Sequence, residues 1–205
     1  MQKITFPFLL IATVYIILLN TTEFSWLVVV KPLPVLLLTI PVFQTLQGWQ
    51  RNVAIAALLF SATGDVVIEY MFVAGIGAFL LAQLCYFSLF ANQHKQLTHR
   101  VSISLLVASF AAIMLWLIYP QVGELLIPIV VYLLVILLMA VAAISSHQPL
   151  WPAVIGTLFF IISDAMIAIN RFYEPIPLER ILIMATYYVA QFLIIQGLTK
   201  KAKDG

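Results

Sequence analysis

The sequence predicts an all-α polytopic membrane protein in which residues 1–205 form a single integral membrane domain. Of the 205 residues, 64% are hydrophobic and 9% are charged, and the mean hydropathy is +1.12. These proportions leave too few polar side chains to cover a water-soluble globule of this size. The apolar runs also reach the length of about 20 residues that a helix needs to cross the hydrocarbon core of a bilayer.

Polar residues, prolines and glycines divide the apolar sequence into eight predicted transmembrane helices. These helices are expected over residues 5–21, 25–46, 52–70, 72–92, 100–119, 124–145, 150–170 and 179–199. The first predicted helix resembles a signal peptide, because a basic residue, Lys3, precedes its apolar run. No small-x-small cleavage site follows it, so we expect it to remain as a helix of the protein.

The distribution of charge predicts the orientation of these helices. An even number of spans places both termini on one side of the membrane. Seven basic residues fall on that side: Lys3, Arg51, Lys95, Arg100, Lys200, Lys201 and Lys203. Three basic residues and all the glutamates fall on the other side: Lys31, Arg171, Arg180, Glu23, Glu69, Glu124, Glu174 and Glu179. Because lysine and arginine are enriched in cytoplasmic loops, both termini are predicted to be cytoplasmic.

Two acids lie inside predicted membrane helices, Asp65 in the third and Asp164 in the seventh. A carboxylate costs about 2.5 kcal/mol or more at the centre of a bilayer, so such a residue suggests a functional site. At about 1.5 Å per residue, each acid lies roughly 6 to 10 Å inside the outer end of its helix. Both are therefore expected at a similar depth in the outer half of the membrane. The alternative is that each acid only forms hydrogen bonds between helices.

The two halves of the chain share short patterns around these acids. The matching pairs are Leu59-Phe60 with Leu158-Phe159 before the acids, and Ala82-Gln83 with Ala190-Gln191 in the helices that follow. The pattern suggests a parallel repeat of four helices plus four, which would turn both acids toward one cavity. Coincidence between apolar segments of low diversity is the alternative.

Two carboxyl groups held close together in a low dielectric do not both ionise readily, so one is expected to act as an acid and the other as a base. Six further residues complete the predicted site: Lys31, Glu69, Gln83, Arg171, Tyr187 and Gln191. Lys31 or Arg171 would receive a phosphate, or would only reach the membrane interface. The amides and the phenol would orient water or the acids, or would only link helices. The same acids would also suit a proton-coupled transporter of small lipids or solutes.

Several classes of site are not expected. The basic residues form no stripe that would bind nucleic acid. The single cysteine, Cys85, rules out a disulfide within the chain and a cysteine-based metal site. His94, His99 and His147 fall in predicted cytoplasmic loops, away from both acids. No cofactor or metal is therefore predicted, although carboxylates alone could still bind a divalent ion.

Five segments in order resemble the YhhN-like lysoplasmalogenase family of eight-span membrane proteins. They read VKPLPVLLL, FSATGDVV, GIGAFLLAQLCYFSLF, LFFIISDAMIAINRF and TYYVAQFLIIQGL, and the resemblance is weakest between Val101 and Ser146. It implies hydrolysis of the vinyl-ether bond of lysoplasmalogens to a fatty aldehyde and a glycerophospho-base such as glycerophosphocholine or glycerophosphoethanolamine. Members of the family often have histidine at the position of Gln83, so hydrogen bonding is favoured there over proton transfer.

The implied reaction fits the two acids. A vinyl ether hydrolyses by protonation at carbon, and water then captures the oxocarbenium ion. One of Asp65 and Asp164 would donate the proton, while the other would stabilise the cation and activate water. The expected partners are a lysophospholipid substrate and membrane lipids. The expected location is a bacterial inner membrane, with the active site toward the extracytoplasmic side.

Overall fold

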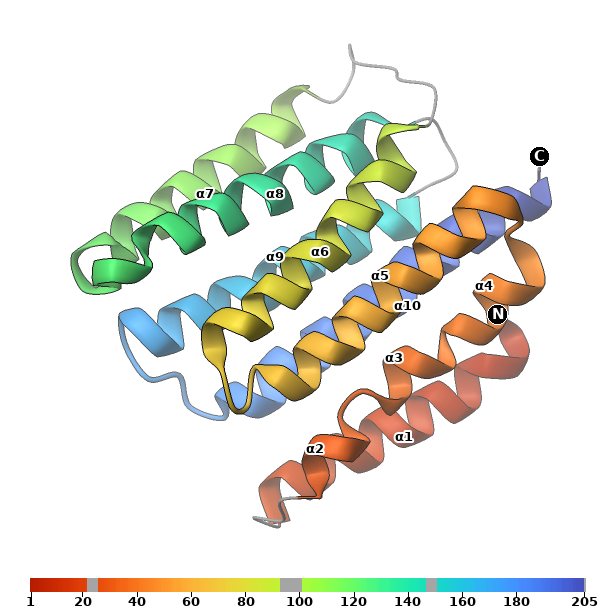
Figure 1. Ribbon diagram of the computed structural model, residues 1–205, viewed down its shortest axis with the longest axis horizontal. Helices are drawn as coiled ribbons and strands as arrows, with labels where there is room; N and C mark the ends of the chain where they lie inside the picture. The colour runs from red at the N-terminus through yellow and green to blue at the C-terminus, as the bar shows by residue number, and fades with distance from the viewer. Residues whose placement is uncertain (22–25, 93–100, 147–150, 205) are drawn as a thin grey trace.

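The computed structural model describes residues 1–21, 26–92, 101–146 and 151–204. Over these residues the chain forms helices joined by short turns (Figure 1), so the all-α prediction is confirmed. The helices are α1 (Gln2–Thr21), α2 (Leu27–Val30), α3 (Leu33–Leu37), α4 (Thr39–Thr45), α5 (Gly48–Val67), α6 (Phe72–Ala91), α7 (Val101–Val122), the 3₁₀ turn η1 (Gly123–Leu125), α8 (Leu126–Ser145), α9 (Trp151–Phe172) and α10 (Glu179–Asp204).

Among the described residues, five helical stretches are long and apolar enough to cross a membrane. They are Leu27–Thr45, Phe72–Ala91, Val101–Ser145, Trp151–Phe172 and Glu179–Lys200. The third stretch turns back on itself at η1, so α7 and α8 form an antiparallel hairpin (Figure 1). These helices indicate an integral membrane protein. The apolar part of α1, Lys3–Leu19, is shorter.

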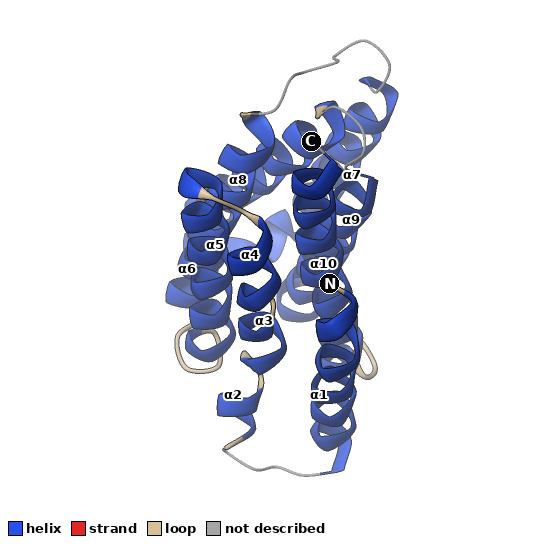
Figure 2. Cartoon of the chain, turned by 90° about the vertical axis from the view of Figure 1, so that its right-hand side faces the viewer, coloured by secondary structure: helices blue, strands red, loops and turns tan. Residues whose placement is uncertain are grey.

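The second predicted helix is not continuous. Figure 2 shows α2, α3 and α4 as three short helices that follow one another. Pro32, Pro34 and Pro41 cause the breaks, since proline has no N–H to donate and its ring clashes with the preceding turn. At the first break, the hydroxyl of Tyr188 on α10 donates to the carbonyl of Lys31 at 2.8 Å. This bond satisfies a carbonyl near the end of α2.

Helices α5, α6, α9 and α10 form the middle of the bundle, with α7 and α8 on one side and α1 to α4 on the other (Figure 1). Small residues hold α9 close to α10. A Cβ atom at Gly156 would lie 2.7 Å from the carbonyl oxygen of Ala190, and one at Gly197 would lie 2.7 Å from the backbone nitrogen of Ala153. Such contacts are typical of membrane helices that pack backbone against backbone.

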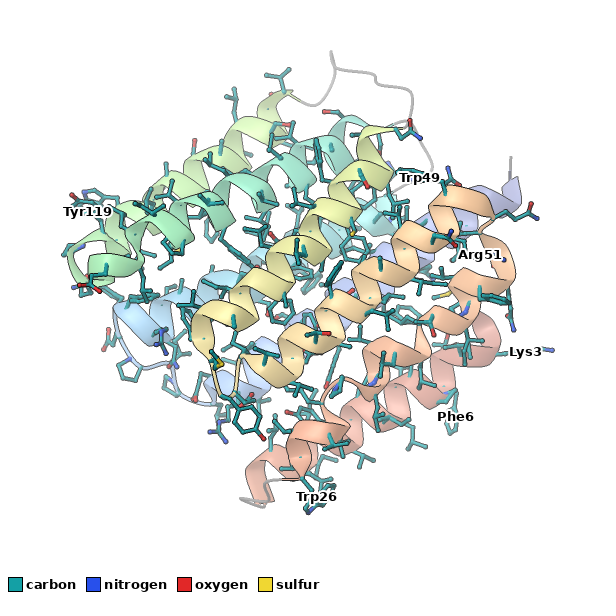
Figure 3. All side chains as sticks on the ribbon, in the orientation of Figure 1. Lys3, Phe6, Trp26, Trp49, Arg51 and Tyr119 are labelled. Carbon is teal, nitrogen blue, oxygen red and sulfur yellow. The ribbon has the colours of Figure 1, made fainter. Side chains whose placement is uncertain are left out.

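The two ends of the bundle differ in their side chains. Lys3, Trp49 and Arg51 lie toward the end that carries both termini, whereas Trp26 and Tyr119 lie toward the opposite end (Figure 3). Aromatic residues at both ends suit the two interfaces of a bilayer. Several residues used in the sequence predictions lie outside the described residues: Glu23, His94, Lys95, His99, Arg100 and His147.

Candidate active site

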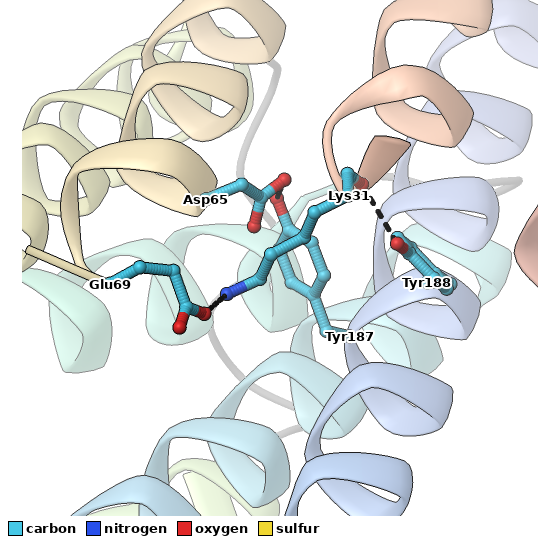
Figure 4. Close-up of polar contacts among 5 residues, drawn as sticks. All are labelled: Lys31, Asp65, Glu69, Tyr187 and Tyr188. Atoms are coloured by element: carbon cyan, nitrogen blue, oxygen red, sulfur yellow. Dashed lines mark hydrogen bonds and ion pairs between the residues drawn. The ribbon is translucent and has the colours of Figure 1, made fainter. Parts of the chain in front are cut away.

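Asp65 belongs to a cluster that we call the Lys31 cluster, formed by Lys31, Asp65, Glu69, Tyr187 and Tyr188, in which all side chains except that of Glu69 are buried. Asp65 is 1% exposed and accepts a hydrogen bond from the Tyr187 hydroxyl at 3.1 Å. The ammonium of Lys31 pairs with Glu69 Oε1 at 2.5 Å, and its side chain passes beside Asp65 (Figure 4). Four of the predicted site residues therefore meet here, and they connect the break between α2 and α3 to α5 and α10.

Gln191 lies in a second buried hydrogen-bond set, one turn further along the same helices. Its Oε1 accepts from the hydroxyl of Tyr86 at 2.6 Å, and its Nε2 donates to Ser61 Oγ at 2.9 Å. All three side chains are fully buried. The arrangement links α5, α6 and α10, which is the interhelical role that the sequence left open for this amide.

Asp164 lies in a third group, the Asp164 triad, which consists of Asp164, Tyr132 and Gln83 from α9, α8 and α6. The Tyr132 hydroxyl donates to Asp164 Oδ2 at 2.7 Å, and Gln83 Nε2 donates to the same oxygen at 3.2 Å. Gln83 Nε2 also donates to the Tyr132 oxygen at 2.7 Å. Within the described part of the chain, Gln83 Oε1 is buried without a hydrogen-bond partner.

An open-sided pocket adjoins the Asp164 triad, and we call it the cavity. Its walls come mainly from α6, α7, α8 and α9, and Asp164 and Tyr132 supply the polar groups among otherwise apolar lining residues. The lining extends from Phe79 and Ile161 up to Phe72 and Phe172, near the ends of α6 and α9. An apolar pocket with a few convergent polar groups is the usual form of a small-molecule or lipid site.

The structure places the two acids in different surroundings, because Asp65 does not line this cavity. Three buried rings, Phe79, Phe160 and Tyr187, pack edge to face between α6, α9 and α10, with centroids 5.7 to 6.4 Å apart. Phe79 lines the cavity beside Asp164, whereas Tyr187 bonds Asp65. The expectation that both acids face one cavity is therefore wrong, because these rings occupy the centre of the bundle.

Arg171 lies beside the end of the cavity that Phe72 and Phe172 line, which we call its mouth. Its guanidinium carbon is 3.9 Å from the centroid of the Phe72 ring and 5.8 Å from that of Phe172, and both rings line the cavity. Lys31 does not line it. Of the two residues predicted to receive a phosphate, the structure brings only Arg171 to the cavity.

Tyr132, which contacts Asp164 most closely, was not predicted from the sequence. A signal was present, because Tyr132 is the one strongly hydrogen-bonding side chain in the first eighteen residues of α8. That signal is ambiguous, because a single phenol in an apolar helix is also common at membrane interfaces. In the described ranges, no three His, Cys, Asp or Glu side chains are grouped to hold a metal ion.

Comparisons with known proteins agree with the resemblance. The YhhN family matches residues 26–198. A lysoplasmalogenase of Mycobacterium tuberculosis is 36% identical over 163 residues, which are 73% of this chain and 61% of that protein. Lysoplasmalogenase TMEM86A of Homo sapiens is 36% identical over 67% of this chain and 61% of its own length. Lysoplasmalogenase TMEM86B of Sus scrofa is 30% identical over 96% of this chain and 87% of its own length. No solved structure matches the chain.

Proposed function

The chain belongs to the YhhN family, and we propose that it is a lysoplasmalogenase that hydrolyses the vinyl-ether bond of lysoplasmalogens. The products would be a fatty aldehyde and a glycerophospho-base. The names of the relatives support this activity, although the chain spans only 61% of the length of the mycobacterial and human TMEM86A relatives. The observation that carries the proposal is the position of Asp164, a carboxyl group with two hydrogen-bond donors in the wall of an apolar cavity.

The contacts of Asp164 suit proton donation to carbon. Tyr132 and Gln83 both donate to Oδ2, and the described residues give Oδ1 no hydrogen-bond partner, so Oδ1 would carry the proton. Neutral Asp164 would protonate the vinyl carbon that does not bear the ether oxygen, and a C–H bond and an oxocarbenium ion would form. The two donors would then stabilise the carboxylate as it balances the new positive charge.

The same carboxylate would complete the reaction. Water adds to the carbon that bears the ether oxygen, and Asp164 takes the proton that the water loses. The resulting hemiacetal breaks its bond to the glycerol oxygen, and the hydroxyl proton moves to that oxygen. Aldehyde and alcohol are released, one water is consumed, and Asp164 is neutral again. One acid therefore suffices, acting first as acid and then as base.

Asp65 has a different part in this proposal. The paired mechanism predicted from the sequence needs Asp65 within reach of the same substrate, but Asp65 lies outside the cavity wall. We assign Asp65, with Glu69 and Tyr187, to holding Lys31 and the broken second helix in place. Arg171 remains the candidate for the substrate phosphate, because it lies at the mouth of the cavity.

We also propose eight membrane passes with cytoplasmic termini, and a cavity mouth toward the extracytoplasmic side of a bacterial inner membrane. The charge distribution supports this orientation. The contacts of the acids support a repeat of four helices plus four. Tyr187 on the last helix bonds Asp65 in the first half, and Gln83 on the fourth predicted helix bonds Asp164 in the second half. Each acid is therefore bonded from the fourth helix of the opposite half.

Purified protein in detergent micelles tests the function. We expect wild-type protein to release fatty aldehyde from lysoplasmenylcholine or lysoplasmenylethanolamine without any gradient. Asp164→Asn should lower kcat by about 10²- to 10⁴-fold, the usual contribution of a general acid. The matched variant Asp65→Asn should retain kcat within about tenfold. No aldehyde from folded wild-type protein would refute the enzyme and favour a carrier, and equal losses in both variants would favour the paired mechanism.

A further inference from the structure

Two aromatic rings and one cation meet at the mouth of the cavity. Phe72, at the start of α6, and Phe172, at the end of α9, pack edge to face with centroids 6.1 Å apart and planes at 70°. Arg171 lies over Phe72, with its guanidinium carbon 3.9 Å from the ring centroid. The described residues give this exposed guanidinium no carboxylate partner within 4.0 Å. Its contacts there are the two rings.

We propose that Phe72 and Phe172 form a subsite for the ammonium end of a zwitterionic lysolipid headgroup, and that Arg171 binds the adjoining phosphate. This inference rests on the proposed function, which supplies the lysolipid. Aromatic faces attract cations, and quaternary ammonium groups bind between such rings. A guanidinium pairs with phosphate through two parallel hydrogen bonds.

Arg171 occupies the ring face in the structure without ligand, and the lipid would replace it. The ammonium group of the headgroup would take the face of Phe72, and the guanidinium would turn to the phosphate. The exchange keeps one cation on the ring and adds a charged pair between Arg171 and the phosphate. A headgroup that lacks the ammonium group would gain the phosphate pair but would leave the ring face without a cation.

The spacing along α9 fits a lysolipid that enters through this mouth. Arg171 follows Asp164 by seven residues, so the two lie on one face of the helix, about 10 Å apart along its axis. In a lysoplasmalogen, a three-carbon glycerol separates the phosphate from the vinyl ether. A phosphate at Arg171 therefore directs the vinyl ether into the cavity, toward Asp164.

Binding of ethers that the enzyme does not cleave tests the subsite separately from the reaction. The two probes are a 1-O-alkyl lysophosphocholine and the matching 1-O-alkyl glycerol 3-phosphate, which lacks the ammonium group. We expect wild-type protein in detergent to bind the choline probe about tenfold more tightly than the phosphate probe. Arg171→Gln should weaken the binding of both probes.

Ring-removing variants locate the cation. Phe72→Leu and Phe172→Leu should each bring the tenfold ratio toward one, whereas Phe72→Tyr, which keeps a ring, should preserve it. Phe110→Leu is the matched control, because Phe110 lines the cavity from α7, about two turns before Ile118 at the mouth end. That variant should leave the ratio unchanged.

Three results would overturn the subsite: a wild-type ratio near one, an unchanged ratio in both leucine variants, or an equal change in Phe110→Leu. The failure of the proposed function gives a different result, in which both probes bind with the expected ratio but lysoplasmalogen yields no aldehyde. The thermal unfolding of each variant in the same detergent shows whether a leucine variant is folded. Phe72→Tyr keeps the test decisive where a leucine variant does not fold.

Discussion

Removing one hydroxyl beside each acid separates their roles. Tyr132→Phe deletes the group that donates to Asp164 Oδ2 at 2.7 Å and accepts from Gln83 at 2.7 Å. Tyr187→Phe deletes the equivalent group at Asp65, where the distance is 3.1 Å. Both changes keep the ring and remove a single oxygen atom, so any difference between them reports on the acid and not on side-chain volume.

The expected magnitude follows from the hydrogen bond that is lost. In the proposed mechanism Asp164 becomes a carboxylate as the proton leaves, and a hydrogen bond to a charged group contributes about 1.5–3 kcal/mol. A tenfold change in rate corresponds to about 1.4 kcal/mol. Tyr132→Phe should therefore lower kcat by about 10- to 150-fold, with KM nearly unchanged because the cavity keeps its shape. Tyr187→Phe should change kcat by less than about threefold.

The assay is aldehyde release at saturating lysoplasmenylcholine in one detergent, for wild-type protein and both variants. Thermal unfolding of the same samples excludes loss of folded protein as the cause. A loss of kcat in Tyr187→Phe as large as that in Tyr132→Phe would refute the assignment of Asp164 as the single reacting acid. A normal kcat in Tyr132→Phe would show that Asp164 does not depend on this donor.

The other predictions concern the parts that support the cavity. Lys31→Met should lower the unfolding temperature but leave KM unchanged, because Lys31 pairs with Glu69 away from the cavity; a raised KM would place the substrate phosphate at Lys31. Gly156→Ala should destabilise the fold by about 1–3 kcal/mol, because the new Cβ would lie 2.7 Å from the carbonyl oxygen of Ala190. Gly77→Ala, where nothing lies within 4 Å of the new Cβ, is the control in denaturant titrations, and equal effects would contradict the packing argument.

The positions of the helices could be predicted from the sequence because length and hydropathy are properties of a linear segment. Helices occupy each of the eight predicted ranges within the described residues. The break after Lys31 was not predicted, although Pro32 and Pro34 mark it. The apolar run continues through both prolines, and hydropathy alone does not distinguish one helix from three short ones in line. Prolines are also tolerated in membrane helices when neighbouring groups satisfy the freed carbonyls.

The residues of the site were easier to predict than their partners. The cost of burying charge in a membrane singles out Asp65 and Asp164 from the sequence alone, and the rise per residue predicts their depth. The rotation of each helix about its axis could not be predicted in this way, because it depends on how side chains of several helices pack together. Asp65 therefore meets Lys31 and Tyr187, whereas Asp164 meets Tyr132 and a cavity.

The side chains that pack beside each acid explain why Asp164 would react and Asp65 would not. Under the proposed repeat, α1 is the counterpart of α7, and α10 is the counterpart of α6. In the first half, Phe8 and Tyr15 of α1 pack against Tyr188 of α10, with centroids 6.0 to 6.3 Å apart. In the second half, α7 lines the cavity with one ring, Phe110, and with three side chains that are not aromatic, Ala111, Met114 and Ile118. Two rings of α1 therefore pack onto α10 near Asp65, whereas α7 lines the cavity beside Asp164 with a single ring and smaller or more flexible side chains, which would leave room for a lipid.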